Sequence, residues 1–387
     1  MTGALEGVRI LDLSWGVAGP IGVLLLAEQG AEVIKVEPPG GDPFRSYPGY
    51  KVWTRSRRSV TCDLKSDAGR AAFDRLAGTA DVLVETYRPG VMDRLGVGYE
   101  EMHTRHRRLI YTSCPAYPPN HRLAGRPGYD QLVAAASGQQ WEQPGWRMGP
   151  IFLSLPTPSM GAIYLVPMGI LAALLAREET GEGQHVETSL LAGAFLYTTQ
   201  IWQWLEEGGG AHNSLMAKTY PPGIHQPMIF ECADGWVHVS VMSGKTPLKT
   251  MDEIVGLDDP PDPMTFPMLP PEERARFTKA RRDAFRKWKA AELVAELRAN
   301  NHAVEEIVPP ERQFEHAQLQ ANDMVATVDD PDLGPTTQIG VPIHLLGTPG
   351  AITGPQPRAG EHDDAIWGEE LGFADDDITA ITGKVGV

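Results

Sequence analysis

Short apolar runs alternate with helix-like segments through the first half of the chain. Strands are predicted at 8–13, 31–37, 81–84 and 109–112, and helices at 21–29, 67–76, 129–136 and 160–177. A strand, a helical crossover and a second strand form a βαβ unit, in which the two strands are parallel. The pattern therefore predicts an α/β fold with an open parallel sheet, which binds its ligands at the carboxyl ends of the strands.

The pattern changes after residue 207, where three glycines follow. The segment 228–244 alternates like a β-hairpin, and a proline-rich connector then leads to a charged helical region at 272–300. The tail is rich in loop residues before a predicted helix that begins at Asp363. These changes divide the chain into an expected large domain, a small α+β domain and a C-terminal segment: 1–224, 225–325 and 326–387.

The uncharged stretch 160–176 is the candidate for a membrane-spanning helix. It is shorter than the about 20 residues that a spanning helix needs, and it contains Pro167. We expect instead a buried helix in a large soluble protein.

Composition narrows the classes of partner and the compartment. The formal charge of −16 argues against a nucleic-acid partner, because such a chain does not attract a polyanion. The three cysteines are widely spaced, which is typical of a reduced, cytoplasmic protein, and no secretory signal is evident. The histidines have no metal-ligand spacing, so no metal is expected.

The first βα turn suggests a nicotinamide cofactor, but its spacing departs from the fingerprint. Glycines stand at 16, 19 and 22, in a GxxGxxG pattern rather than GxGxxG, and Pro20 removes a backbone donor. Glu37 ends the second strand, where an acid that binds ribose would stand. The alternative is a tight turn followed by a surface acid, and we favour it.

A basic run lies between residues 51 and 65 of this acidic chain: Lys51, Arg55, Arg57, Arg58 and Lys65. Such a run is ordinarily a solvated surface. It could also bind a small phosphorylated ligand, because guanidinium groups match phosphate oxygens. Arg88 and Arg94 could add to that site.

Five segments, in order, resemble one known family: "LDLSWGVAGPIGVLLLAEQGAEVIKVEPPGGDPFR", "TRSRRSVTCDLK", "ADVLVETYRPGVMDRLGVGYEE", "GILAALLAREETGEGQHVETSLLAGA" and "GEHDDAIW". The family is the class III CoA-transferases, which include formyl-CoA transferase, the carnitine and bile-acid CoA-transferases and α-methylacyl-CoA racemase. The resemblance covers most of the chain. It implies a Rossmann-like large domain built from N- and C-terminal segments, a small domain, and two chains that interlock as a dimer.

The resemblance also implies coenzyme A or acyl-CoA as the bound substrate, with no metal. Carried over position by position, the CoA contacts are Gly16, Val17, Ala18, Cys62, Asp63, Leu64, Lys65, Thr86, Tyr87, Val91, Arg94 and Leu95. Arg94 is the best supported of these, because its motif is intact and a guanidinium suits phosphate. Thr86 departs from the family, which usually has asparagine there.

The catalytic position departs furthest from the family. Its transferases use an aspartate that attacks the acyl-CoA thioester, giving a mixed anhydride and then an enzyme–CoA thioester. Ten residues before Gly169, where that aspartate is expected, this chain has Ser159. Racemases of the family use a histidine in a Gly-His-Asp segment, where this chain has Tyr129 followed by Asp130. Asp130 and Glu142 are the carboxylates left nearby.

Three interpretations remain open. The chain could bind acyl-CoA as a subunit of a CoA-transferase whose partner chain carries the aspartate, or act alone as a homodimer with shifted chemistry at Asp130, Glu142 or Ser159. Shifted chemistry would include racemase, hydratase or lyase reactions. The third interpretation is an acyl-CoA-binding protein without turnover. We favour transfer of CoA between carboxylic acids, with a family member as partner.

Overall fold

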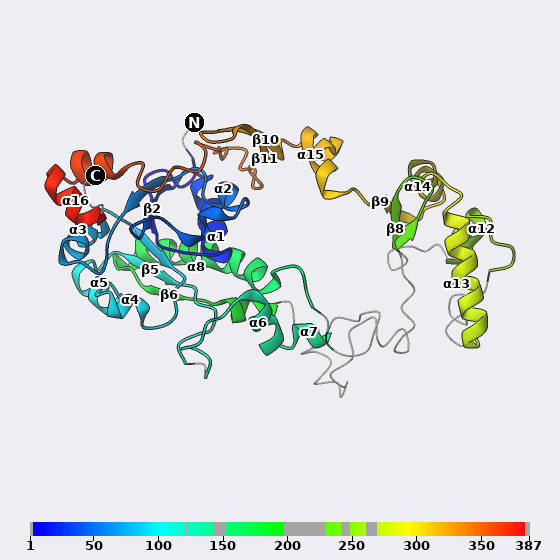
Figure 1. Ribbon diagram of the computed structural model, residues 1–387, viewed down its shortest axis with the longest axis horizontal. Coiled ribbons are helices and arrows are strands. Elements are labelled where there is room, and N and C mark those ends of the chain that lie inside the picture. Colours follow the sequence, from blue (N-terminus) through cyan, green and yellow to red (C-terminus); the bar gives the residue numbers. More distant parts are fainter. Residues whose placement is uncertain are drawn as a thin grey trace. The chain divides into compact units, whose positions relative to one another are not determined.

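A parallel β-sheet forms the centre of the larger of two units into which the chain divides (Figure 1). The computed structural model describes residues 3–120, 122–142, 150, 152–196, 229–240, 248–260 and 269–383. The first unit comprises Met1–Glu142, Pro150–Glu206 and Gln318–Val387, and the second comprises Gln143–Gly149 and Glu207–Ala317. The boundaries expected from the sequence stay a prediction, since 197–228 lies outside the described residues.

Six parallel strands make the sheet, in the order β3-β2-β1-β4-β5-β6. They are β1 (Arg9–Asp12), β2 (Glu32–Glu37), β3 (Arg58–Thr61), β4 (Val82–Glu85), β5 (Ile110–Ser113) and β6 (His185–Glu187). The expected α/β class with a parallel sheet is confirmed. The two edge strands, β3 and β6, were not predicted, because β3 lies inside the basic run and β6 is only three residues long.

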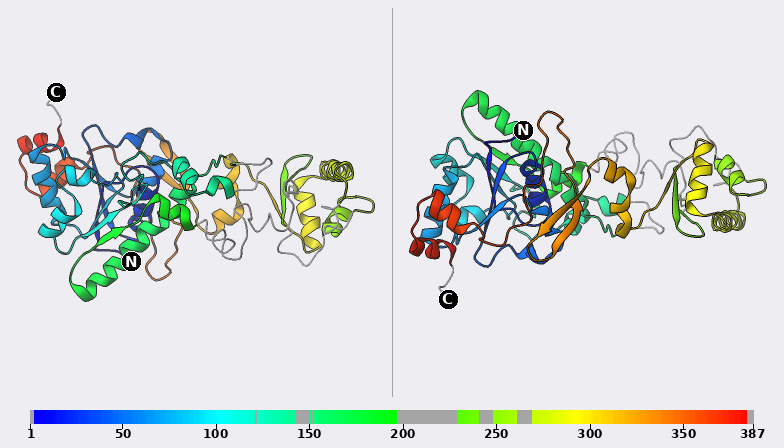
Figure 2. Two further views of the ribbon diagram at one scale, coloured as in Figure 1. Left: turned by 90° about the horizontal axis from the view of Figure 1, so that it is seen from below. Right: turned by 90° about the horizontal axis from the view of Figure 1, so that it is seen from above.

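Helices cover both faces of this sheet (Figures 1 and 2). On one face, α1 (Ala18–Ala27) and α8 (Thr157–Thr180) pack on Ile10, Val33 and Val82. On the other face lie α3 (Asp67–Ala77), the π-helix η4 (Asp364–Glu370) and α16 (Asp375–Thr382), with Leu11, Ile34 and Leu83 beneath them. Neighbouring residues of each strand therefore point into two separate cores, as the pleat requires.

Shorter elements complete the first unit. They are η1 (Pro43–Ser46), α2 (Tyr50–Trp53), α4 (Val91–Arg94), α5 (Tyr99–Arg105), α6 (Asp130–Ala136), α7 (Gln139–Glu142), α9 (Leu190–Leu196), and the antiparallel hairpin of β10 (Val325–Asp330) and β11 (Gly334–Ile339). Helix α15 (Ala317–Ala321) lies at the boundary between the units.

Helix α8 contains the stretch considered above as a membrane span, and it runs unbroken through Pro167. It is the one helix among the described residues that is long and apolar enough to cross a membrane, a property that core helices of soluble proteins share. Its buried residues Ala162, Val166 and Ile170 belong to the core beneath α1. This packing buries one face of α8 within the fold, while other apolar residues of the helix stay exposed.

Close packing of α8 on α9 depends on two glycines. A Cβ on Gly161 would lie 2.3 Å from the carbonyl oxygen of Gly193, and a Cβ on Gly193 would lie 2.2 Å from the carbonyl oxygen of Pro158. Both neighbours are backbone atoms, which cannot move aside as a side chain can. The two helices therefore touch through their main chains.

The C-terminal segment secures the edge strand β3. His362 accepts a hydrogen bond from the Ser59 amide at Nδ1, and Asp363 accepts hydrogen bonds from the amide and hydroxyl of Thr61, both at 2.7 Å. These residues belong to the "GEHDD" segment. Pairing of this kind covers the hydrogen-bonding groups of an otherwise open edge.

The second unit is an α+β arrangement with its own core. An antiparallel sheet of β7 (Ile229–Glu231), β8 (Trp236–Ser240) and β9 (Ala303–Glu306) accompanies α12 (Leu248–Ile254), α13 (Pro271–Phe285), α14 (Ala290–Ala299) and η3 (Pro310–Glu315). The predicted hairpin around Asp234–Gly235 is confirmed. The predicted charged helical region at 272–300 contains two helices, α13 and α14. Asp234 accepts a hydrogen bond from the Ala290 amide at 2.8 Å, and so caps the first turn of α14.

We expect the variant Gly161→Ala to unfold at lower denaturant concentration than the parent protein. The added methyl group would overlap a backbone carbonyl of α9 and force the helices apart, at a cost of about 1–3 kcal/mol. Gly125→Ala is the matched control, because a Cβ there has no atom within 4 Å. Urea unfolding followed by circular dichroism measures both. Equal midpoints for the two variants would contradict the close packing.

Candidate functional site

The strand order reverses between β1 and β4, which makes the carboxyl ends of these strands the expected ligand crevice. We call this place the switch crevice, formed by the loop 13–17 and the loop 86–90. The Trp15 amide donates to Thr86 Oγ1 at 2.7 Å, and the Thr86 hydroxyl is within 3.1 Å of the Trp15 carbonyl. Gly16 has φ +80°, which favours glycine. The two loops are thus joined to each other at the point where a ligand would bind.

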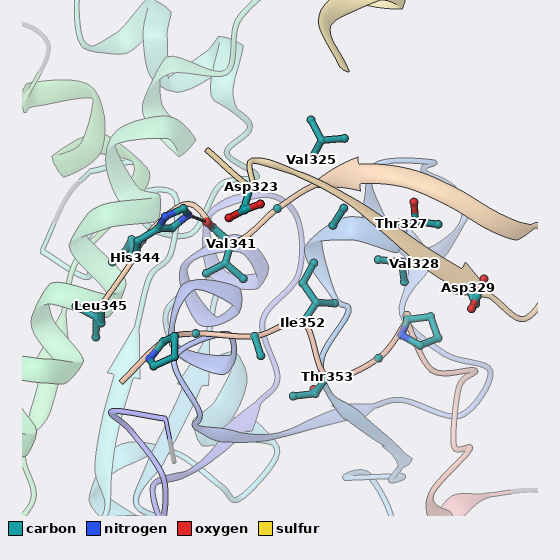
Figure 3. A pocket seen from close by; sticks show the side chains of 18 of the residues that line it. Asp323, Val325, Thr327, Val328, Asp329, Val341, His344, Leu345, Ile352 and Thr353 are labelled. Atoms are coloured by element: carbon teal, nitrogen blue, oxygen red, sulfur yellow. Dashed lines mark hydrogen bonds between the residues drawn. The ribbon is translucent and has the colours of Figure 1, made fainter. Parts of the chain in front are cut away.

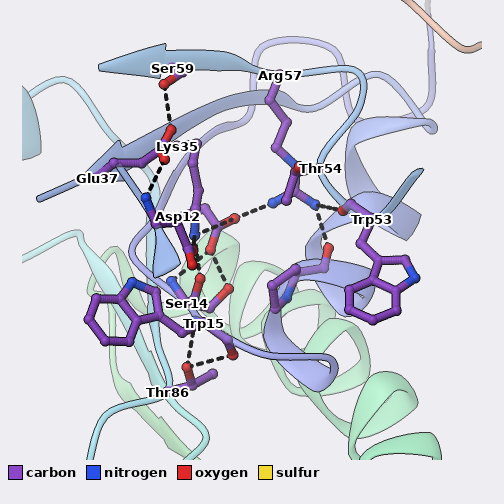
Figure 4. Close-up of polar contacts among 12 residues, drawn as sticks. Asp12, Ser14, Trp15, Lys35, Glu37, Trp53, Thr54, Arg57, Ser59 and Thr86 are labelled. Atoms are coloured by element: carbon purple, nitrogen blue, oxygen red, sulfur yellow. Dashed lines mark hydrogen bonds and ion pairs between the residues drawn. The ribbon is translucent and has the colours of Figure 1, made fainter. Parts of the chain in front are cut away.

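A buried network of charges holds the first of these loops (Figure 4). Asp12, at the end of β1, pairs with Arg57 and accepts hydrogen bonds from the amide and hydroxyl of Ser14. Lys35 of β2 donates to the Ser14 carbonyl and pairs with Asp42 at 3.2 Å. All of these side chains are nearly inaccessible to water. The network fixes the path of the chain immediately before the switch crevice.

Arg57 also reaches the start of α1. Its guanidinium donates to the Pro20 carbonyl and, at 2.7 Å, to the Trp53 carbonyl. One cation therefore joins the end of β1, the first turn of α1 and the end of α2. Helix α1 itself begins at Ala18, three residues before the predicted start at residue 21.

Glu37 is committed to the fold rather than to a ribose. Its side chain is fully buried and accepts hydrogen bonds from Arg45 at 2.6 Å, the Ser59 hydroxyl at 2.6 Å and the Asp42 amide at 2.8 Å. Burial alone would raise the pKa of Glu37, but its bonds to Arg45 and Ser59 and the charge of Lys35 hold it below the usual value. The ribose-binding role considered for this acid therefore has no support in the structure.

Most of the basic run is used in internal ion pairs. Arg55 is fully buried and pairs with Glu28 at 2.5 Å, Lys51 pairs with Asp330 at 2.9 Å, and Arg58 pairs with Glu32 and Glu370. The paired members of the run therefore form neither a solvated surface nor a phosphate cradle, and Lys65 is the member that stays exposed. The cause is the strand β3, which carries Arg58 and places its neighbours inside the fold.

The expected CoA contacts follow the carboxyl ends of β1, β3 and β4. Gly16, Val17 and Ala18 lie in the turn before α1 and at its start, and Ala18 is buried. Thr86 and Tyr87 follow β4, with Val91, Arg94 and Leu95 in and after α4. Tyr87 and Leu95 pack against the core beneath α3, while Arg94 is exposed.

The segment 62–65 lies further from the switch crevice than the other expected CoA contacts do. Cys62 is buried and its thiol donates to the Gly69 carbonyl, while the Asp63 amide donates to the Ile381 carbonyl. Leu64 packs against the core, and Lys65 is exposed. Since β3 and β4 are three strand positions apart, roughly 14 Å, only an extended ligand could contact both groups.

Asp130 and Ser159 lie in direct contact. Asp130 begins α6 and accepts hydrogen bonds from the Ser159 amide at 2.7 Å and the Ser159 hydroxyl at 2.8 Å. Ser159 belongs to the first turn of α8 and is 2% exposed. The side chain of Tyr129 is 66% exposed, and that of Glu142 lies outside the described residues. The carboxylate of Asp130 thus occupies the positive end of a long helix.

The Asp130–Ser159 pair lies at the same edge of the sheet as the switch crevice. Helix α8 leads into the parallel strand β6, so it runs against the strands and begins at their carboxyl ends. The same argument places the start of α1 there, and α1 and α8 touch at Gly22 and Val166. Chemistry at residue 159 and binding at the crevice can therefore act on one ligand.

A cavity of about 730 Å³ lies elsewhere, between the β10–β11 hairpin and the segment 340–355 (Figure 3). Its lining combines apolar residues such as Val325, Val341 and Ile352 with polar ones such as Asp323 and His344. The Ala351 amide donates to the carbonyl of Glu28, just after α1. Because α1 ends at the amino edge of the sheet, this cavity is remote from the switch crevice. Among the described residues, no group of three or more His, Cys, Asp or Glu side chains could hold a metal ion.

Three side chains organise the site: Asp12, Lys35 and Arg57. The sequence pattern did not point to Asp12 or Lys35, and it predicted a different role for Arg57. A signal was present in "RILDLS" and "EVIKVE", where Asp12 and Lys35 interrupt strands that are otherwise apolar. A charge inside a buried strand needs a partner of opposite charge. Which partner it meets depends on the strand order, which the sequence did not supply.

Comparison with known proteins agrees with this geometry. The formyl-CoA:oxalate CoA-transferase of Streptomyces avermitilis is 29% identical over 98% of each chain. The succinyl-CoA–L-malate CoA-transferase beta subunit of Chloroflexus aurantiacus is 27% identical over 98% of this chain and 97% of its own. A crystal structure of Rv3272 from Mycobacterium tuberculosis is 27% identical, covers 95% of this chain and 99% of its own, and has a TM-score of 0.76.

The family model for CoA-transferase family III matches residues 5–363, which include every strand of the parallel sheet and the Asp130–Ser159 pair. The resemblance seen in the sequence is therefore confirmed at the level of the family. This chain belongs to CoA-transferase family III.

Proposed function

We propose that this chain takes part in the transfer of CoA between carboxylic acids and binds an acyl-CoA at the switch crevice. Family membership and the CoA-transferase relatives support the reaction class. The switch crevice supports the placement, because it joins the expected contacts at 16–18 and 86–95 at one edge of the sheet. The free thiols of Cys62, Cys114 and Cys232 are in keeping with a cytoplasmic location.

Three exposed cations suit the phosphates of CoA: Lys65, Arg88 and Arg94. All three follow the carboxyl ends of β3 or β4, unlike the paired cations of the basic run. In this proposal the phosphates lie near Arg94, whose guanidinium can donate two hydrogen bonds to one phosphate group. The thioester then points toward Ser159 and Asp130.

The contact between Asp130 and Ser159 carries the proposal that a partner chain supplies the nucleophile. Ser159 stands where the family is expected to have its aspartate, is buried, and donates its hydroxyl hydrogen bond to Asp130. Both oxygens of Asp130 already accept hydrogen bonds from Ser159, which lowers their reactivity toward a thioester. A relative that is a beta subunit fits an assembly of two different chains.

The proposed route keeps atoms and charge in balance. A carboxylate of the partner attacks the acyl-CoA carbonyl, which forms an anhydride and releases the CoA thiolate. The thiolate attacks the enzyme's side of the anhydride, which gives an enzyme–CoA thioester and the free acid. The acceptor carboxylate then repeats the two steps in reverse, and the product is a new acyl-CoA.

A second candidate is catalysis by this chain alone, with Asp130 as the nucleophile. The observation in its favour is that the Asp130 carboxylate lies within 2.8 Å of the side chain at position 159. Release of the Ser159 hydroxyl bond on substrate binding would free one oxygen. Racemase, hydratase or lyase chemistry belongs to this candidate.

We also propose that α8 forms part of a contact between two chains. Met160, Tyr164, Met168, Leu171 and Leu175 follow each other at spacings of three and four residues and are exposed. Such a stripe marks one face of the helix, and an exposed apolar face of this extent is typical of an interface. The proposal applies equally to a homodimer and to a pair of different family members.

The first prediction concerns turnover. We expect the purified chain alone to exchange no CoA between an acyl-CoA and a free acid, as followed by mass spectrometry. Addition of a family III chain that carries the aspartate, such as one encoded beside it, should start the exchange. Exchange by this chain alone, abolished by Asp130→Asn, would establish the second candidate instead.

The substitution Ser159→Asp should restore a nucleophile at this position. Incubation with acyl-CoA and then hydroxylamine should yield a hydroxamate at residue 159, detected by peptide mass spectrometry. Ser159→Asn is the matched control, because it has nearly the same shape but no carboxylate. A variant that binds CoA yet never forms the hydroxamate would contradict the assignment of position 159.

Another prediction concerns the affinity for CoA. Arg94→Gln should raise the Kd for CoA about tenfold or more, because a charged hydrogen bond to phosphate contributes about 1.5–3 kcal/mol. Arg107→Gln is the control, since Arg107 is exposed at the amino edge of the sheet, before β5. Isothermal titration calorimetry measures both. An unchanged Kd in the Arg94 variant would refute this placement of the phosphates.

A further prediction concerns the assembly of the protein into dimers. Met168→Glu places a charge in the middle of the α8 stripe and should shift the protein from dimer to monomer in light scattering after gel filtration. Leu333→Glu, an exposed leucine on the turn between β10 and β11, is the control and should leave the mass unchanged. A parent protein that is monomeric on its own and with the partner chain would rule out the interface.

A further inference from the structure

Three polar side chains form a row across β4, β5 and β6: Glu85, Ser113 and His185. Glu85 ends β4 and is paired in register with Ser113, the last residue of β5. This register sets the Glu85 carboxyl beside the Ser113 hydroxyl, whose interaction with it lowers the pKa of Glu85. Ser113 Oγ lies 3.0 Å from Nε2 of His185, the first residue of β6. The proposed CoA transfer uses none of these groups.

One end of this row of side chains, Glu85, lies at the switch crevice. The Tyr87 amide donates to Glu85 Oε2 at 2.7 Å, so the carboxylate fixes the backbone directly after Thr86. The Tyr87 ring meets the Trp15 ring edge-on, with centroids 5.0 Å apart. Glu85 therefore holds one loop of the crevice against the other.

The other end of this row of side chains, His185, lies at the surface. Glu85 is 6% exposed, whereas His185 is half-buried on the edge strand. The His185 ring stacks on Tyr99, with centroids 4.5 Å apart, and meets the edge of Tyr111. A buried carboxyl group needs a path to exchange its proton with water, and Ser113 and His185 form such a path.

The surroundings of Glu85 favour its neutral form more strongly than water favours the neutral form of an exposed carboxyl group. Burial raises the pKa of Glu85 to about 7, and Asp93 of α4 adds to the shift, while the Ser113 hydroxyl and the Tyr87 amide oppose it. Burial lowers the pKa of His185, against the charges of Glu187, Glu100 and Asp93. The remaining titratable neighbours stay protonated, since burial raises the pKa of Cys114 to about 12 and also raises those of Tyr87 and Tyr111.

We propose that Glu85 is a positioning residue of the switch crevice, and that its protonation is coupled through Ser113 to the tautomer of His185. The coupling follows from the donors and acceptors available. When Glu85 is ionised, it accepts from the Ser113 hydroxyl, and Ser113 accepts from the Nε2–H of His185. When Glu85 is protonated, it donates to Ser113, which then donates to an unprotonated Nε2, and the proton of His185 is on Nδ1.

The interconversion conserves protons. Glu85 passes its proton to Ser113 Oγ, Ser113 passes its own to His185 Nε2, and the Nδ1 proton of His185 leaves to water. Glu85 loses one proton overall, while Ser113 and His185 stay neutral. The only part of this inference that rests on the proposed function is the assignment of the crevice to CoA.

The first test observes the tautomer without any ligand. We expect the ¹⁵N shifts of His185, in protein labelled at its 11 histidines, to change from the Nδ1–H to the Nε2–H tautomer as the pH rises from 5.5 to 8.5. His185→Gln identifies the signal. Glu85→Gln donates to Ser113 at every pH, so it should keep the Nδ1–H form throughout, and Ser113→Ala should uncouple the two groups. A single tautomer in the parent protein, or the same switch in Glu85→Gln, would overturn the proposal.

The second test measures CoA affinity against pH by the fluorescence of Trp15 in the crevice. The parent protein should bind CoA roughly threefold to tenfold more weakly at pH 8 than Glu85→Gln does, because the ionised carboxylate repels an anionic ligand. At pH 6 the Kd values of the two proteins for CoA should agree within about twofold, since both proteins keep the bond to the Tyr87 amide. Glu85→Ala removes that bond and should bind weakly at both values.

The outcomes separate the two ideas. Equal pH dependence in the parent and Glu85→Gln proteins would overturn the positioning role. A tautomer switch together with no CoA binding by the folded parent protein would overturn the proposed function and support the coupling alone.

Discussion

The buried contact of Asp12 with Arg57 and Lys35 is the constraint on which the rest of the site depends. Two cations and a carboxylate inside the fold carry a large desolvation cost, which only close pairing and further hydrogen bonds can offset. Here those bonds go to backbone carbonyls of Ser14, Pro20 and Trp53. The network therefore determines where the first loop, the start of α1 and the end of α2 lie relative to one another.

The alternation of the strands separates two polar systems on opposite faces of one sheet. Asp12, Lys35 and Glu37 point toward α1, whereas Glu85 and Ser113 point toward α3 and α5. The two systems meet at Trp15, Thr86 and Tyr87, where the loops after β1 and β4 are bonded to each other. A ligand in the switch crevice would thus contact backbone that is fixed from both sides.

The first turn of α8 contains Ser159, which stands where the family is expected to have its catalytic aspartate. A carboxylate contacts position 159, but it comes from Asp130 of α6 and accepts hydrogen bonds from the amide and hydroxyl of Ser159. The pair stabilises the positive end of a long helix, which is a structural role in its own right. The exposed apolar stripe on the same helix is the surface that we propose for contact with a second chain.

The sequence alone determined the fold class, the principal strands and helices, and the family, because these depend on local periodicity and on motifs in a fixed order. It also identified Ser159 and Asp130 as candidate catalytic residues. Only the tertiary structure decided what the charged residues do. Arg55 and Arg57 read as free cations in the sequence, yet each meets a carboxylate from a distant strand or helix. Pairing of this kind depends on strand order and on the direction in which each side chain points, and neither is encoded in any short stretch of sequence.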